Sequence, residues 1–191
     1  GATFTHPVIA DTAVVLSNTA AGQTIRFEDN LSTGSLLTTG NGYHLELLGA
    51  NTSVSAATTF LNTGSLTLGN AAGDVLTFAG GLVATAPSSI SLGGTVSTTN
   101  TAMSLGDGNT ALTLADHLTL NTAGGALSLN GAVDGTLANT QSLTLNAGSA
   151  GVVSVTGDVG QTTSLHTLTL SHSHGATFTH PVIADTAVVL S

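Results

Sequence analysis

The sequence predicts an all-β fold, a parallel β-helix (β-solenoid) in which the chain coils through short stacked strands. Three observations predict it. Apolar residues alternate with Ser or Thr over short segments, helix-favouring charged residues are almost absent, and the first seventeen residues recur unchanged as the last seventeen. Alternation at every second residue is the period of a strand with one buried face. A sequence that repeats at a fixed period is typical of an open stack of coils.

The expected strands follow one another along the chain, each an alternating segment closed by Gly, Asn or another turn residue. They are SLTLGN at 65–70, SISLGG at 89–94, ALTLAD at 111–116, HLTLNT at 117–122, ALSLNG at 126–131, SLTLN at 142–146, VSVTG at 153–157 and LTLSH at 168–172. In each segment Leu, Ile or Val is expected to point inward and Thr or Ser outward.

One inward anchor per turn gives the expected coil length. The anchors are Val14, Leu45, Leu66, Ile90, Leu118, Leu143, Leu168 and Val188. They predict about seven coils of roughly 25 residues per repeat, a length that suits a three-sided helix. The longest step contains the additional segment TIRFED. Stacked at the strand spacing of about 4.8 Å, seven coils would form roughly 34 Å of rod.

The segment GATFTHPVIADTAVVLS stands at 1–17 and again at 175–191, 174 positions apart. Chance does not produce seventeen consecutive identities, so 1–174 is expected to be one full repeat unit and 175–191 the start of the next. Either the chain is a window on a longer protein of near-identical tandem repeats, or its ends were matched deliberately. In both cases Ser173, His174 and Gly175 form the seam between repeats.

A resemblance to a known family rests on the segment LTLNAGSAGVVSVTGDVGQTTSLHTLTLSHSHGATF, residues 143–178. Its pattern L-T-L-x-A-G, then G-x-V-x-x-x-G-x-V-G, L-x-x-L-x-L and G-A-T-F resembles the repeats of giant bacterial exoproteins of the filamentous-haemagglutinin type and related β-strand-repeat adhesins. The likeness covers 100–191 well and the first half more loosely. It implies a right-handed parallel β-helix secreted to the cell surface, and it implies no catalytic or ligand-binding residues.

The charge balance excludes several classes of function. One basic residue, Arg26, stands against ten acidic residues, and the net charge is −9. Nucleic acid is not an expected partner, because phosphate contacts require basic side chains. No apolar run approaches the ~20 residues of a spanning helix, so this segment is not expected to insert into a membrane. A chain with one Arg and no G-x-S-x-G motif is not expected to be an enzyme. Arg26 is expected to pair with Glu28 or a neighbouring acid.

Histidines are the chemical feature that stands out. His172 and His174 are two positions apart and would share one side of an extended segment, where they are candidate ligands for zinc or copper. Alternatively, a corner near Ser171–Gly175 turns them into solvent, or they form a pH-responsive contact between filaments. Asp residues beside Gly, as in GDG at 106–108, are candidate calcium ligands or turn formers. No other cofactor is expected.

These observations together predict a structural extracellular fibre or adhesin shaft for surface attachment, cell–cell contact or biofilm matrix. Its expected partners are identical repeats end to end, with lateral contacts between fibres; the sequence does not specify a carbohydrate or surface ligand. The alternative is a filament subunit that assembles non-covalently, in which the duplicated segment fills the seam between separate chains. An ice-binding solenoid with outward Thr columns is a further alternative, but the unequal coil steps suit it poorly.

Overall fold

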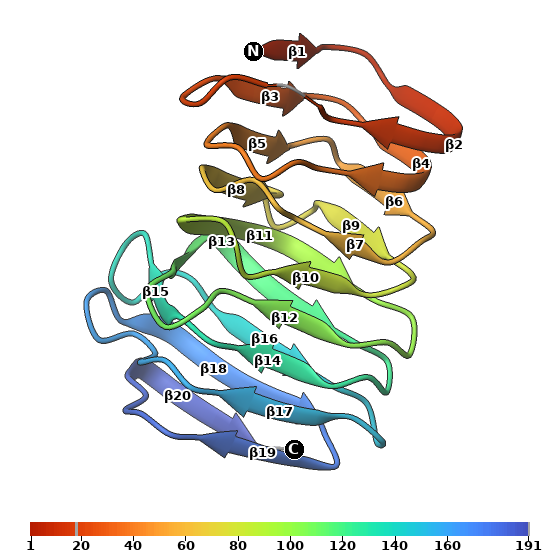
Figure 1. Ribbon diagram of the computed structural model, residues 1–191. Helices are drawn as coiled ribbons and strands as arrows, with labels where there is room; N and C mark the ends of the chain where they lie inside the picture. The colour runs from red at the N-terminus through yellow and green to blue at the C-terminus, as the bar shows by residue number, and fades with distance from the viewer. Residues whose placement is uncertain (18, 191) are drawn as a thin grey trace.

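The computed structural model describes residues 1–17 and 19–190, and within them the chain forms twenty β-strands joined by turns (Figure 1). Ser191, the last residue of the second copy, lies outside the described residues. The paired strands run parallel, and their coils stack into one elongated body from the red N-terminal end to the blue C-terminal end (Figure 1). The described residues contain no helix long and apolar enough to cross a membrane.

The strands form three faces. Face 1 consists of β1 (Ala2–Phe4), β3 (Thr24–Phe27), β5 (His44–Leu47), β8 (Ser65–Leu68), the first halves of β11 (Ser89–Ser97) and β13 (Ala111–Asn121), and β15 (Ala132–Gly135). Face 2 consists of the first halves of β2 (Val8–Val15) and β4 (Leu31–Leu37), β6 (Asn51–Val54), β9 (Val75–Phe78), the second halves of β11 and β13, β16 (Leu143–Asn146), β18 (Leu165–His172) and β20 (Ala184–Leu190). Face 3 consists of the second halves of β2 and β4, β7 (Thr58–Thr59), β10 (Leu82–Ala84), β12 (Met103–Leu105), β14 (Leu127–Leu129), β17 (Val152–Val155) and β19 (Gly175–Phe178).

The core is a set of apolar columns, built from residues that occupy the same place in successive coils. One column of face 1 contains Ala2, Ile25, Leu45, Leu66, Ile90, Leu112, Val133, Val159 and Val182. The spacing along it varies, from 20 residues between Ile25 and Leu45 to 26 between Val133 and Val159. The predicted parallel β-solenoid is therefore confirmed, with coils of unequal length.

Each strand divides its residues between core and surface as the alternation predicts. In β8, Leu66 and Leu68 are fully buried, while Ser65 and Thr67 are half-buried on the outer side. Burying a leucine side chain contributes roughly 1.5–3 kcal/mol. Because every coil adds such residues to continuous columns, the hydrophobic core runs along the length of the stack.

The number of coils is somewhat higher than the anchors predicted. Seven complete turns separate Ala2 from Val159 along the face 1 column, and the second copy of the segment begins later still, at Gly175. The anchors gave fewer turns because β11 and β13 each bend across two faces. Ile90 lies on face 1, whereas the next anchor, Leu118, lies on face 2 opposite Gly94. That step therefore covered more than one turn.

Candidate functional site

The repeat seam is a solvated corner between face 2 and face 3. β18 ends at His172, Ser173 and His174 make the turn, and β19 starts at Gly175. The backbone N–H of His174 donates to the carbonyl of Gly151 at 2.7 Å, and β19 then pairs with β17. The chain therefore enters the second copy of the segment without a break in the stacking.

The two identical segments lie on different faces of the solenoid. In the first copy, Ala2 pairs with Ile25 on face 1 and Val8 with Leu31 on face 2. In the second copy, the equivalent Ala176 pairs with Val153 on face 3. Val182, the equivalent of Val8, pairs with Val159 on face 1. The second copy is thus displaced by one face around the solenoid relative to the first copy. The inward anchors taken from the sequence did not predict this displacement.

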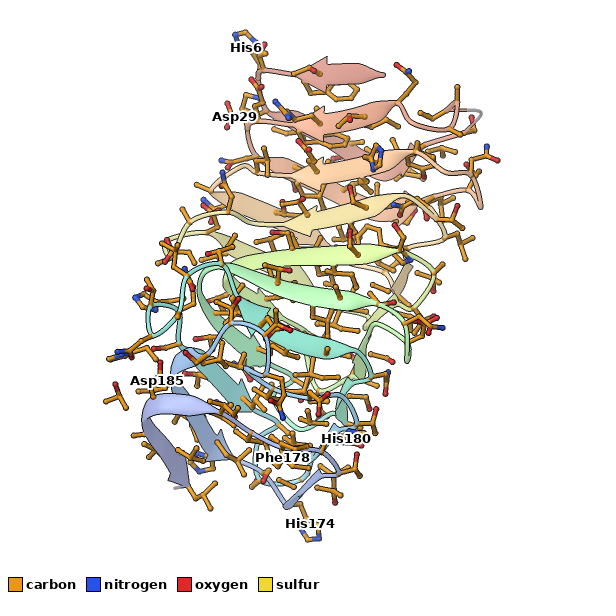
Figure 2. The ribbon with its side chains drawn as sticks, turned by 90° about the vertical axis from the view of Figure 1, so that its left-hand side faces the viewer. His6, Asp29, His174, Phe178, His180 and Asp185 are labelled. Carbon is orange, nitrogen blue, oxygen red and sulfur yellow. The ribbon has the colours of Figure 1, made fainter. Side chains whose placement is uncertain are left out.

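Polar side chains of the second copy contact the coil that precedes it. His180 Nδ1 lies 3.4 Å from Asp158 Oδ1, and the hydroxyl of Ser164 donates to Asp185 Oδ2 at 2.5 Å. The hydroxyl of Thr186 lies 3.1 Å from His166 Nδ1. His180, Asp185 and Phe178 lie at the C-terminal end of the stack, opposite to His6 (Figure 2).

His172 and His174, the candidate metal ligands, lie at a solvated corner of the chain, as the alternative interpretation of this pair expected. His172 and His174 are both exposed, on either side of the half-buried Ser173. Within residues 1–17 and 19–190, no three His, Cys, Asp or Glu side chains group closely enough to hold a metal ion. The pair offers two imidazoles, and zinc or copper binding there stays a prediction.

Other histidines bond one coil to the next, a role that the sequence did not indicate. His44 Nδ1 lies 2.8 Å from the hydroxyl of Ser65 and also accepts its backbone N–H at 3.0 Å. His117 Nδ1 accepts the backbone N–H of Ser142 at 3.2 Å. In both pairs the serine stands one coil after the histidine, and this spacing is the signal that could have identified them.

Two of the aspartates accept backbone hydrogen bonds from turns, Asp74 at a corner and Asp134 at the end of β15, which is the turn-forming role considered for such residues. The backbone N–H groups of Asn70 and Ala71 both donate to Asp74 Oδ2, at 2.8 and 3.0 Å. Asp134 Oδ1 accepts the N–H groups of Thr162 and Thr163 at 2.9 and 3.0 Å. These carboxylates therefore hold turns in place within or between coils.

Arg26 forms the expected ion pair, chiefly with a residue of the next coil. Its Nε donates to Glu46 Oε2 at 2.5 Å, and Nη1 lies 3.7 Å from Glu28 Oε1. The hydrogen bond with Glu46 raises the pKa of Arg26. Because the arginine side chain is 42% exposed, the pair contributes little to stability.

An open hollow of about 380 Å³ lies on face 2 near the N-terminal end. It is lined by Pro7, Ile9, Asn30, Leu31, Ser32, Asn51 and Ser53. All of these lining residues are uncharged.

Compared with known proteins, the chain matches no family model, no curated protein and no solved structure.

A corner aspartate gives one prediction on acid sensitivity. The backbone N–H of Asn109 and the hydroxyl of Thr110, which donate to Asp107, hold the pKa of this carboxyl below its ordinary value of 3.8. A carboxyl whose pKa is depressed by folding stabilises the protein above the unfolded-state pKa, and this stability is lost as the pH falls through the folded-state value. Hence D107N should be less stable than the native chain at pH 5, and the difference should shrink below pH 3.8.

The measurement is the urea midpoint from pH 5 to pH 2.5. T110V is the matched control, since it keeps the carboxylate and the Asn109 N–H donor but removes the hydroxyl donor. Its urea midpoint should retain part of the pH dependence of the native chain. A constant difference between D107N and the native chain at every pH would contradict the prediction.

Proposed function

We propose that this chain is a segment of a structural extracellular fibre or adhesin shaft, built from tandem β-solenoid units. The shaft would serve surface attachment, cell–cell contact or biofilm matrix. Its action would be mechanical, because coils that contact only their neighbours add up to a rod whose length follows the number of units.

One observation carries this proposal: both ends of the stack are formed by the same seventeen residues. Each end coil has a parallel sheet edge, and such an edge is a template for another strand. In the first copy, β1 pairs with β3 of the next coil. In the second copy, β19 pairs with β17 of the preceding coil. The two ends therefore suit addition of further units.

The chemistry of the surface suits a shaft that contacts neighbouring rods. Arg26, the one basic residue besides histidine, is engaged by Glu46 and Glu28. Face 3 carries an outward column of Ser104, Ser128 and Ser154 in register on successive strands. Such columns supply donors and acceptors for hydrogen bonds to a neighbouring rod.

The experiment that tests the proposal is the mass of native material under denaturing conditions, with a range that extends to megadaltons. We expect a species far above the 18.6 kDa of this chain, as covalent tandem units require. Electron microscopy of the same material should show rods.

A discrete species near 18.6 kDa would contradict a covalent array. If that material still formed rods before denaturation, the units would be separate filament subunits joined through the seam. Material without rods in either state would exclude both forms of the fibre.

A further inference from the structure

The duplicated segment has two sides, and each copy has one of them covered by strands. On the C-terminal side of the first copy, Phe4 stacks on Phe27 with ring centroids 4.7 Å apart and an interplanar angle of 13°. Farther along this copy, Val8 and Val15 pair with Leu31 and Leu37. These contacts show how the segment begins a unit.

The second copy shows how the segment follows the end of a unit. Phe178 pairs with Val155, and Val188 pairs with Leu168. Three of its polar residues, His180, Asp185 and Thr186, contact side chains of the preceding coil. In the part of the chain that the structure describes, no coil precedes the first copy, so its His6, Asp11 and Thr12 have no equivalent partners.

We propose that successive copies of this chain are joined by one shared coil, in which a single segment is both the end of one unit and the start of the next. This inference rests on the proposed function and specifies its joint. The segment would be covered on both sides at once. Its phenylalanine would lie between Val155 of one unit and Phe27 of the following unit, and its histidine would face Asp158 of the earlier unit.

The exposure of equivalent residues supports this joint. Ile9 in the first copy is 76% exposed, whereas Ile183 in the second copy is 38% exposed. The preceding coil thus covers about half of the surface that the first copy leaves open. Phe4 is still 38% exposed although it stacks on Phe27. Both values indicate a segment that fits strands on either side.

The displacement of the second copy fixes how units are oriented. Face 3 of one unit, which ends at Val153, continues as face 1 of the next, because Ala176 is the equivalent of Ala2. Face 1 likewise continues as face 2 through Val182, the equivalent of Val8. A unit therefore spans seven turns and two further faces, and three units are needed before a face returns to its original side.

This geometry has a consequence for the shaft. A surface feature confined to one face of the unit, such as the serine column of face 3, would be presented on all three sides of the rod in turn. With strands about 4.8 Å apart, each unit would add about 37 Å of length. Lateral contacts could then form in three directions.

The test uses full-length chains and two exposed positions. One chain, the donor, carries V189C. The other, the acceptor, carries V8D and L37C. Val8 is partly buried and packs against the core, so an aspartate there should loosen the acceptor's own first segment. The donor's second segment could then take its place on β4, with position 189 opposite position 37, as Val15 lies opposite Leu37 within one chain.

A disulfide is geometrically suitable at this pair, since neighbouring strands lie about 4.8 Å apart and bridged Cα atoms lie about 4.4–6.8 Å apart. The native chain has no cysteine to interfere. After mixing and oxidation, the donor–acceptor dimer is quantified by mass spectrometry. We expect at least tenfold more of it than in two controls. One control places the acceptor cysteine one coil farther on, as T59C in place of L37C, and the other adds V182D to the donor.

Equal yields in the three mixtures, or no donor–acceptor dimer in any of them, would overturn the shared coil. The mass of native material is an independent readout. Megadalton material without the specific dimer would retain the fibre and exclude this joint. The specific dimer together with native material that forms no rods would retain the joint and exclude the fibre.

Discussion

Replacing Phe78 with alanine is expected to lower the free energy of unfolding by about 3–5 kcal/mol, the usual cost of truncating a buried phenylalanine. The Phe78 side chain is fully buried and lies on face 2, paired with Val54. Its ring meets Phe60 edge to face, with centroids 5.8 Å apart and an interplanar angle of 83°. Because coils above and below fix the surrounding backbone, the core is not expected to collapse into the space left by the ring.

Urea unfolding followed by circular dichroism measures this loss, and F4A is the matched control. Phe4 is also stacked on another ring, but it lies in the first coil and is 38% exposed. Its truncation should cost about 1 kcal/mol, since less area leaves water on folding. If F78A and F4A lowered the midpoint equally, the end coils would be as tightly packed as the middle, and the core described above would be wrong.

The strands could be predicted from sequence because alternation assigns each residue to the core or the surface locally. Leu112 and Leu114 are buried as expected, and Thr113 between them points outward. The prediction failed where a residue's environment depends on a corner. Thr122, in the segment HLTLNT, was expected outside with other threonines, yet it is buried, and its hydroxyl donates to the backbone carbonyl of Gly125. The buried Thr98 makes the same bond to the carbonyl of Thr101. A satisfied hydroxyl can occupy a buried corner without penalty.

The faces of the duplicated segment could not be predicted for a related reason. Alternation gives the side of a strand on which a residue lies, but it does not give the position of that strand around the solenoid. That position depends on every corner before it, and the coil steps vary between 20 and 26 residues. One bend inside β11 was enough to transfer the anchors from face 1 to face 2. The corner expected near Ser171–Gly175, because burial of an unpaired pair of histidines is unfavourable, is present: Ser173 and His174 make a turn between β18 and β19.

Replacing Gly131 with alanine is expected to destabilise the protein by about 2–3 kcal/mol, the upper part of the usual range for overpacking. Gly131 is buried at the corner between faces 3 and 1. A Cβ added there would lie 2.0 Å from the carbonyl oxygen of Thr110 and 3.1 Å from that of Asp107. Both are backbone atoms of the preceding coil, so no side chain can rotate away. The two coils would have to separate, with loss of hydrogen bonds between strands.

Gly108 supplies the matched control, because it lies in the same corner of that preceding coil. A Cβ added at Gly108 meets no heavy atom within 4 Å, and the residue is not in the left-handed region. G108A should therefore leave stability unchanged or raise it by about 0.4–1 kcal/mol, through the reduced entropy of the unfolded chain. The same substitution thus has opposite expected effects on two glycines of one corner. If G131A and G108A had equal urea midpoints, the two coils would separate freely at this corner. Close stacking of the coils would then not limit which residues the corner accepts.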